Sequence, residues 1–150
     1  MPLVKDAPHQ DITYRIIGAA IEVHNELGPG FKEEVYQRAL DLKMPKFSLS
    51  FESQKPVEVY NAEGAAVALF YLDDFVETKV IVEIKAQSGP MTPEDMRQVI
   101  EYFAAVPEAD AALWINFGRR RLEFHRLFPP RKIVEHRQKQ AQRITDKMNG

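Results

Sequence analysis

Cysteine is absent from the chain, which excludes disulfides, zinc–thiolate sites and cysteine nucleophiles. The four histidines, His9, His24, His125 and His136, show no paired spacing such as His-x-x-x-His, so a histidine metal site has no local support. No apolar run approaches the ~20 residues that a membrane-spanning helix needs, and the N-terminus MPLVKDAPHQ has no apolar signal core. These absences predict a cytoplasmic protein that does not use a membrane.

The remaining composition is that of an ordinary globular chain. Of its 150 residues, 45% are apolar, which is enough to form one buried core, and 28% are charged. We therefore expect a single domain over residues 1–150, with a core at about 11–128 and a basic C-terminal extension at 129–150. The net charge of −2 is unevenly spread, since residues 1–118 carry −9 and residues 119–150 carry +7. The basic end is expected either to contact phosphates or to form a solvated tail.

Apolar spacing and turn residues predict the order of elements. Residues 11–27 and 31–43 have helical spacing, with Asp11 as the expected N-cap of the first helix. Thr92-Pro93-Glu94-Asp95 is typical of a helix start, and this third helix is expected to run to about Val106. Five strands and a last helix complete the set: 50–61, 65–76, 79–86, 111–117, 121–128 and the residues after Pro129-Pro130. The order predicts an α/β fold with α+β character, in which helices flank a central mixed sheet.

The segment DDFVETKVIVEIKA, residues 73–86, ends an apolar strand with two charges. Alternate strand residues share a face, so Glu83 and Lys85 lie on one side of the strand. The opposite side is wholly apolar and is expected to face the core: Val80, Val82 and Ile84. An ordinary Glu–Lys surface pair without function is the alternative explanation of the two charges.

The length of the hairpin loop decides which aspartate lies opposite Glu83. A three-residue loop, 77–79, pairs Asp73 with Glu83, whereas a two-residue loop, 78–79, pairs Asp74 with it. Directly opposite side chains are ~5 Å apart at Cβ, and two carboxylates at that distance repel each other unless a proton or a cation intervenes. Oxygen ligands of this kind favour Mg²⁺ or Mn²⁺.

An acidic residue on one strand, followed by Glu-x-Lys on the next, resembles the motif of the PD-(D/E)xK nuclease superfamily. LGPGFKEEVYQRAL, residues 27–40, resembles more closely the motif that names the GxxExxY family, which is placed in that superfamily; the matching residues are Gly30, Glu33 and Tyr36. The resemblance covers about residues 12–128. It implies a restriction-endonuclease-like core and Mg²⁺-dependent hydrolysis of phosphodiester bonds in nucleic acid.

The resemblance also departs from the family pattern. Leu72 stands where the motif has proline, and Asp74 stands where an aliphatic residue is expected, which leaves open which aspartate faces the site. Residue by residue, the resemblance matches Asp73 to the motif aspartate, Glu83 and Lys85 to the (D/E)xK pair, Glu33 to the helix glutamate, and Gln98 and Tyr102 to a Gln-x-x-x-Tyr on the following helix.

These residues would act together on a phosphodiester. Asp73, Glu83 and the Ile84 carbonyl would hold the ion, and Lys85 would orient the attacking water or stabilise charge on the phosphoryl oxygens. The remaining candidates are Glu33 near the ion, Gln98 as a brace for Lys85, and Tyr102, Arg119, Arg120 and Arg121 as nucleic-acid contacts. The expected partners are DNA in preference to RNA and a second copy of the chain in a homodimer. The alternatives are a non-catalytic nucleic-acid-binding module and an interaction protein whose C-terminal helix binds a partner.

Overall fold

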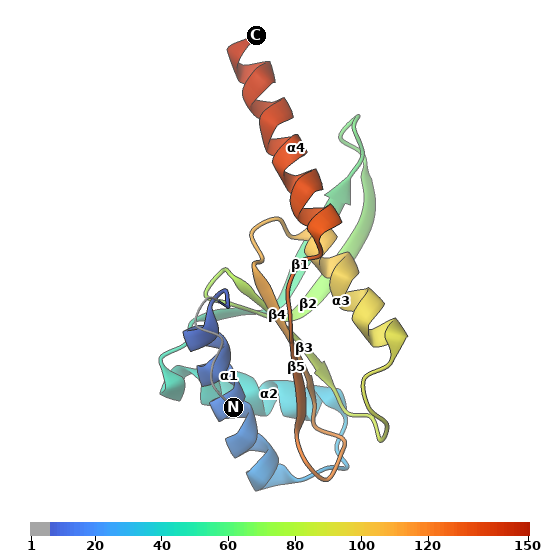
Figure 1. The fold of residues 1–150 in the computed structure, drawn as a ribbon. Helices are drawn as coiled ribbons and strands as arrows, with labels where there is room; N and C mark the ends of the chain where they lie inside the picture. Colours follow the sequence, from blue (N-terminus) through green and yellow to red (C-terminus); the bar gives the residue numbers. More distant parts are fainter. Residues whose placement is uncertain (1–6) are drawn as a thin grey trace.

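A five-stranded sheet forms the centre of the molecule in the computed structural model, which describes residues 7–150 (Figure 1). β3 and β4 pair in parallel, and all other neighbouring strands pair antiparallel, so the predicted mixed sheet is confirmed. The strands lie side by side in chain order: β1 (Phe51–Tyr60), β2 (Ala66–Val76), β3 (Val80–Lys85), β4 (Ala111–Asn116) and β5 (Glu123–Leu127).

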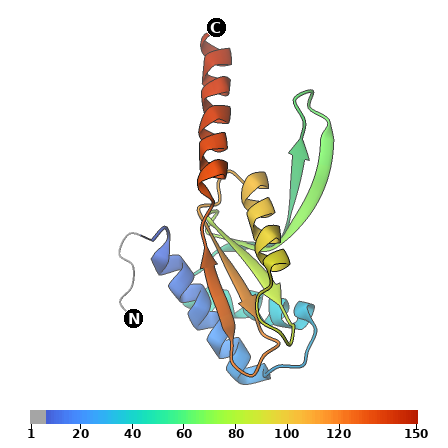
Figure 2. The same ribbon diagram turned by 45° about the vertical axis from the view of Figure 1, so that its right-hand side comes forward.

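Helices cover both faces of this sheet. α1 (Gln10–Leu27) and α2 (Glu33–Lys43), followed by the short 3₁₀-helix η1 (Met44–Phe47), cover one face, and α3 (Pro93–Ala105) covers the other (Figure 2). The inner strand β3 is therefore apolar on both sides until its last residues. Its even-numbered residues pack under α1 and α2, whereas Ile81 packs under α3.

The starts of α3 and α1 show where the sequence predicted the N-cap residue correctly and where it did not. The predicted helix start at Thr92 is confirmed, and Thr92 and Asp95 form a capping box at the start of α3. The expectation that Asp11 caps α1 is wrong, because the helix begins one residue earlier and its N-cap is His9, in the left-handed region at φ 55°. Asp11 lies in the first turn instead, where its charge favours the helix dipole.

The β2–β3 hairpin has the longer of the two loops considered. Val76 pairs with Val80 and Asp74 pairs with Val82, so the loop is Glu77–Lys79. Glu77 and Thr78 both adopt positive φ angles, which close this three-residue loop. In this register the next residue, Asp73, comes opposite Glu83.

α4 (Arg131–Asn149) projects from the body beyond the end of the sheet (Figure 1). Only its base is held: Ile133 packs against the core under α3, and the Arg137 guanidinium donates hydrogen bonds to the carbonyls of Phe103, Val106 and Ala109. None of the side chains in the helix is buried. Like the other helices within residues 7–150, α4 is not long and apolar enough to cross a membrane.

The turn after β4 packs against the loop that follows β3, and Gly118 makes this contact. A Cβ atom on Gly118 would lie 2.4 Å from the backbone nitrogen of Gln87 and 2.5 Å from the carbonyl carbon of Ala86. We therefore expect Gly118→Ala to destabilise the fold by about 1–3 kcal/mol, since backbone must move to admit the methyl group. Gly89→Ala is the matched control, because nothing lies within 4 Å of its Cβ position. Chemical unfolding of both variants measures the effect, and equal stabilities would contradict this packing.

Candidate functional site

The site begins where β2 and β3 separate. Their backbone ladder ends at the pair Asp74–Val82. Beyond this pair, the Ile84 N–H donates to the side chain of Asp73, at Oδ2 over 2.7 Å, and not to a backbone carbonyl of β2. This bond fixes one carboxylate oxygen of Asp73 beside the end of β3, while the side chain remains partly exposed.

Glu83 is the most buried acidic group of the site, at 5% exposure. Its Oε1 lies 3.5 Å from Lys85 Nζ, and its Oε2 is buried without a hydrogen-bond partner among residues 7–150. Burial, and then the charge of Asp73, raise the pKa of Glu83 to about 8, although Lys85 opposes this shift. Burial likewise raises the pKa of Asp73, against the hydrogen bond from Ile84. The two carboxyls therefore crowd one another.

Lys85 is held by Gln98 of α3, which is itself bonded to Tyr102 of the same helix. Its Nζ donates to Gln98 Oε1 over 3.2 Å, and Gln98 Nε2 donates to the Tyr102 hydroxyl over 3.1 Å. Gln98 and Tyr102 are four residues apart and so share one face of the helix. The structure thus joins Glu83, Lys85, Gln98 and Tyr102 in one chain of contacts, with the ammonium beside the carboxylates.

Glu33 approaches the same carboxylates from α2. It is exposed at the first residue of the helix, and its charge raises the pKa values of both Asp73 and Glu83. The loop before it is fixed by Tyr36, which is buried and donates its hydroxyl proton to the Gly28 carbonyl. A hollow of about 570 Å³ opens here, lined by Gly30, Phe31, Lys32, Glu33, Glu34 and Ala86.

Arg119, Arg120 and Arg121 follow the end of β4. Because β3 and β4 are parallel, this turn lies at the same edge of the sheet as Lys85. His24 donates a ring N–H to the Arg119 carbonyl over 2.9 Å, which ties the turn to α1. All three arginines are exposed and line a hollow of about 540 Å³.

Two residues of the site had no place in the sequence prediction. Gln37 donates from Nε2 to the Asp73 carbonyl over 2.8 Å and so supports β2 at the site. Its signal was the four-residue spacing from Glu33, which puts both on one face of α2. Asn116 is fully buried and bonds to backbone groups of Gln87, Gly89 and Gly118, fixing the loop after Lys85. The sequence interpretation assigned it no role.

The donors fit a hard divalent cation, although they are few. In the part of the chain that the structure describes, no three His, Cys, Asp or Glu side chains form a metal-binding group. Asp73 and Glu83 supply two carboxylates, and Glu83 Oε2 is a buried oxygen without a partner. Oxygen donors of this type suit Mg²⁺ or Mn²⁺, which retain several waters and need few protein ligands.

Comparisons with known proteins agree with this architecture. No curated protein matches the sequence. A chain in a crystal structure titled "Crystal structure of SSO0001" is similar in fold, with a TM-score of 0.51 and 14% identity, over 69% of this chain and 56% of that one. The family model described as the PD-(D/E)XK nuclease superfamily matches residues 10–127, the region of the restriction-endonuclease-like sheet and its flanking helices. The chain therefore belongs to the PD-(D/E)XK nuclease superfamily.

Proposed function

We propose that the protein is a Mg²⁺- or Mn²⁺-dependent nuclease that hydrolyses phosphodiester bonds, with DNA as its substrate in preference to RNA. The observation that supports this most is the convergence of Asp73, Glu83 and Lys85, with Lys85 held by Gln98. We also assign the chain to the GxxExxY family, and propose that it acts as one domain, residues 1–150, in a homodimer.

The carboxylates of Asp73 and Glu83, with the Ile84 carbonyl, would hold the ion. A bound Mg²⁺ or Mn²⁺ polarises a phosphodiester oxygen and lowers the pKa of a water molecule. Because the pKa of Glu83 is raised to about 8 in the protein alone, Glu83 must lose a proton at neutral pH when a cation binds. Cation binding at neutral pH therefore releases this proton, and the affinity of the site for the ion should rise with pH.

Lys85 acts on the substrate in this proposal. Its ammonium orients the attacking water or stabilises negative charge on the phosphoryl oxygens, and the contact with Gln98 restricts its position. Glu33 lies near enough to influence the carboxylates electrostatically, while Tyr102, which is 6% exposed, holds Gln98 in place. Arg119, Arg120 and Arg121 bind backbone phosphates at the same edge of the sheet.

A second candidate function is nucleic-acid binding without cleavage. Helical spacing places five basic side chains on one face of α4: Lys132, His136, Lys139, Arg143 and Lys147. This exposed face suits a phosphate backbone whether or not the site is active. Binding that is unaffected by Glu83→Gln, together with no cleavage under any metal condition, would favour this function. A protein partner for α4 is the third candidate, and an unchanged oligomeric state and partner profile after deletion of residues 131–150 would contradict it.

Cleavage assays on pure protein test the leading proposal. With linear, nicked and single-stranded DNA and with RNA, we expect activity only when Mg²⁺ or Mn²⁺ is present. Lys85→Ala and Asp73→Asn should each lower the rate at least about 100-fold, since each removes a group that acts on the reacting phosphate or its ion. Lys79→Ala, which changes a lysine in the exposed hairpin loop, is the control. Unchanged activity in Lys85→Ala and Asp73→Asn would reject the assignment.

The raised pKa of Glu83 predicts how stability depends on pH. Between the usual value of 4.5 and about 8, the folded state keeps a proton on Glu83 that the unfolded chain has lost. The free energy of unfolding must therefore fall as pH rises through this window. In chelator, Glu83→Gln should reduce that fall by about 2 kcal/mol, because a neutral amide replaces the buried acid.

Guanidinium unfolding at pH 5 and pH 9 measures this difference, with the fluorescence of Trp114, the single tryptophan, as the signal. Glu34→Gln serves as the control, since it removes an exposed carboxylate on α2. A pH dependence in Glu83→Gln as steep as that of the unmodified protein would mean that Glu83 keeps an ordinary pKa.

The arginine turn predicts a salt-dependent contact. In a Lys85→Ala background, which separates binding from cleavage, Arg120→Glu with Arg121→Glu should weaken DNA binding at least about 10-fold. The slope of log affinity against log salt should become shallower by about 2, as fewer counterions are released. Lys46→Glu, on the exposed surface of η1, is the control. Fluorescence anisotropy over a salt series checks both numbers, and equal slopes would exclude the turn from the interface.

A further inference from the structure

A second acidic pair lies on the opposite face of the sheet from Glu83. Asp74 follows Asp73 directly, so its side chain points to the other face, under α2. It is 0% exposed, and neither of its carboxylate oxygens has a hydrogen-bond partner among residues 7–150. A buried carboxylate without a donor is costly, so its surroundings must supply a compensating positive charge or proton.

The neighbour of Asp74 is another carboxyl group, that of Asp41 on α2, which is close enough for a side-chain hydrogen bond. Asp41 Oδ2 accepts a hydrogen bond from Ser53 Oγ over 2.8 Å. Its Oδ1 is buried and lacks a partner within the same described residues. Two carboxyl groups from different elements, α2 and β2, therefore lie within hydrogen-bond reach of one another, and that of Asp41 is also bonded to a hydroxyl group.

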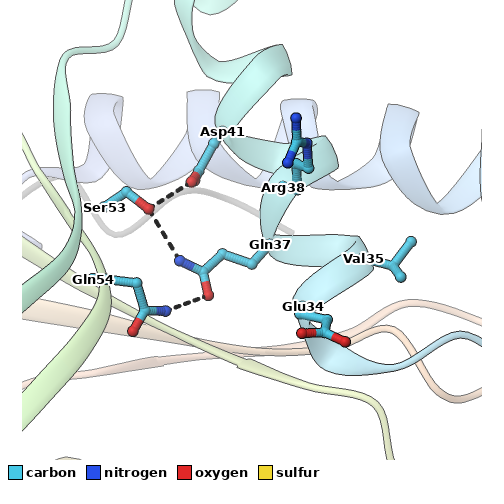
Figure 3. Close-up of a pocket in the computed structure, with 7 residues that line it drawn as sticks. All are labelled: Glu34, Val35, Gln37, Arg38, Asp41, Ser53 and Gln54. Atoms are coloured by element: carbon cyan, nitrogen blue, oxygen red, sulfur yellow. Dashed lines mark hydrogen bonds between the residues drawn. The ribbon is translucent and has the colours of Figure 1, made fainter.

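Asp41 lines a hollow of about 780 Å³ between α2 and β1. Figure 3 shows Asp41 and Ser53 pointing toward one another at one side of it, with Gln37 and Gln54 bonded below them. The hollow gives solvent and small ions a path to Asp41 that does not pass through the sheet. The remaining lining residues are Glu34, Val35 and Arg38.

The number of unpartnered oxygens distinguishes two ways of compensating the pair. A proton shared between Asp41 and Asp74 bridges one oxygen of each and leaves the second oxygen of Asp74 buried without a partner. A divalent cation held between the two carboxyl groups would instead cancel the charge of both carboxylates. Carboxylate and hydroxyl oxygens are the ligands that hard cations such as Mg²⁺, Mn²⁺ and Ca²⁺ prefer.

We propose that Asp41 and Asp74 bind a hard divalent cation, with Ser53 Oγ and water from the adjoining hollow completing its coordination. This site is separate from that of Asp73 and Glu83 and does not depend on the proposed nuclease activity. Gln37 connects the two, since its Nε2 donates to Ser53 Oγ over 3.2 Å and to the Asp73 carbonyl over 2.8 Å. The second ion thus restrains β2 where Asp73 leaves the ladder.

Counting bound Mn²⁺ by electron paramagnetic resonance tests this site in the full chain. The background is Asp73→Asn with Glu83→Gln, which removes the carboxylates of the first site. We expect this protein to retain one Mn²⁺ per chain. Adding Asp41→Asn or Asp74→Asn should weaken that binding at least about 10-fold, whereas adding Glu34→Gln, a carboxylate lining the same hollow, should leave it unchanged.

Circular dichroism establishes that each variant is folded, and Asp41→Asn, on the more exposed member of the pair, keeps the test valid when Asp74→Asn does not fold. A folded background protein that binds no Mn²⁺ would overturn the proposal and favour a shared proton. Retention of the ion in folded Asp41→Asn would overturn it as well. Failure of the nuclease function is distinguishable, because absence of cleavage by the unmodified protein leaves the Mn²⁺ count in the background variants unaffected.

Discussion

The hydrogen bond from the Ile84 N–H to the Asp73 carboxylate is the contact on which the rest of the site depends. A continuous β2–β3 ladder would give this donor a backbone carbonyl and leave no opening between the strands. Here the side chain supplies the acceptor, so the strands separate while the buried N–H remains satisfied. The register of the hairpin places Asp73 opposite Glu83 at the same point. The change of acceptor therefore explains the end of the ladder, and the register explains why two carboxylates meet there.

That arrangement opposes stability in the absence of an ion. Burial raises the pKa values of Asp73 and Glu83, and on the other face of β2 it raises the pKa of Asp74 to about 10. A sheet built only for stability would place apolar residues at these positions, as the neighbouring Val82 and Ile84 show. Lys85 offsets part of the cost from a distance of 3.5 Å, but it is one cation beside two acids. The surplus negative charge is what a divalent cation would neutralise.

Local chemistry predicted most of the fold, because its signals lie within a few residues of each other. The helix start at Thr92 and the alternation of β3 were both predicted correctly, and the three-residue hairpin loop was one of the two options considered. The N-cap of α1 was wrong because a left-handed His9 starts the helix without a side-chain cap. For the site, the Glu-x-Lys motif predicted that Glu83 and Lys85 lie together. It could not predict the role of Asn116, because the hydrogen-bond partners of that residue lie 27 and 29 residues away.

The two adjacent aspartates show why the remaining chemistry required the three-dimensional structure. Strand alternation alone implies that Asp73 and Asp74 point to opposite faces, yet it does not tell what each one meets. The Asp73 carboxylate accepts a hydrogen bond from the Ile84 N–H and lies near the Lys85 ammonium, and both favour its charged form. Asp74 meets Asp41, a carboxyl that is 33 residues earlier in the chain and belongs to a different element. Both residues are aspartates, so only their partners across the fold distinguish the carboxylate beside Lys85 from the carboxyl group buried against another acid.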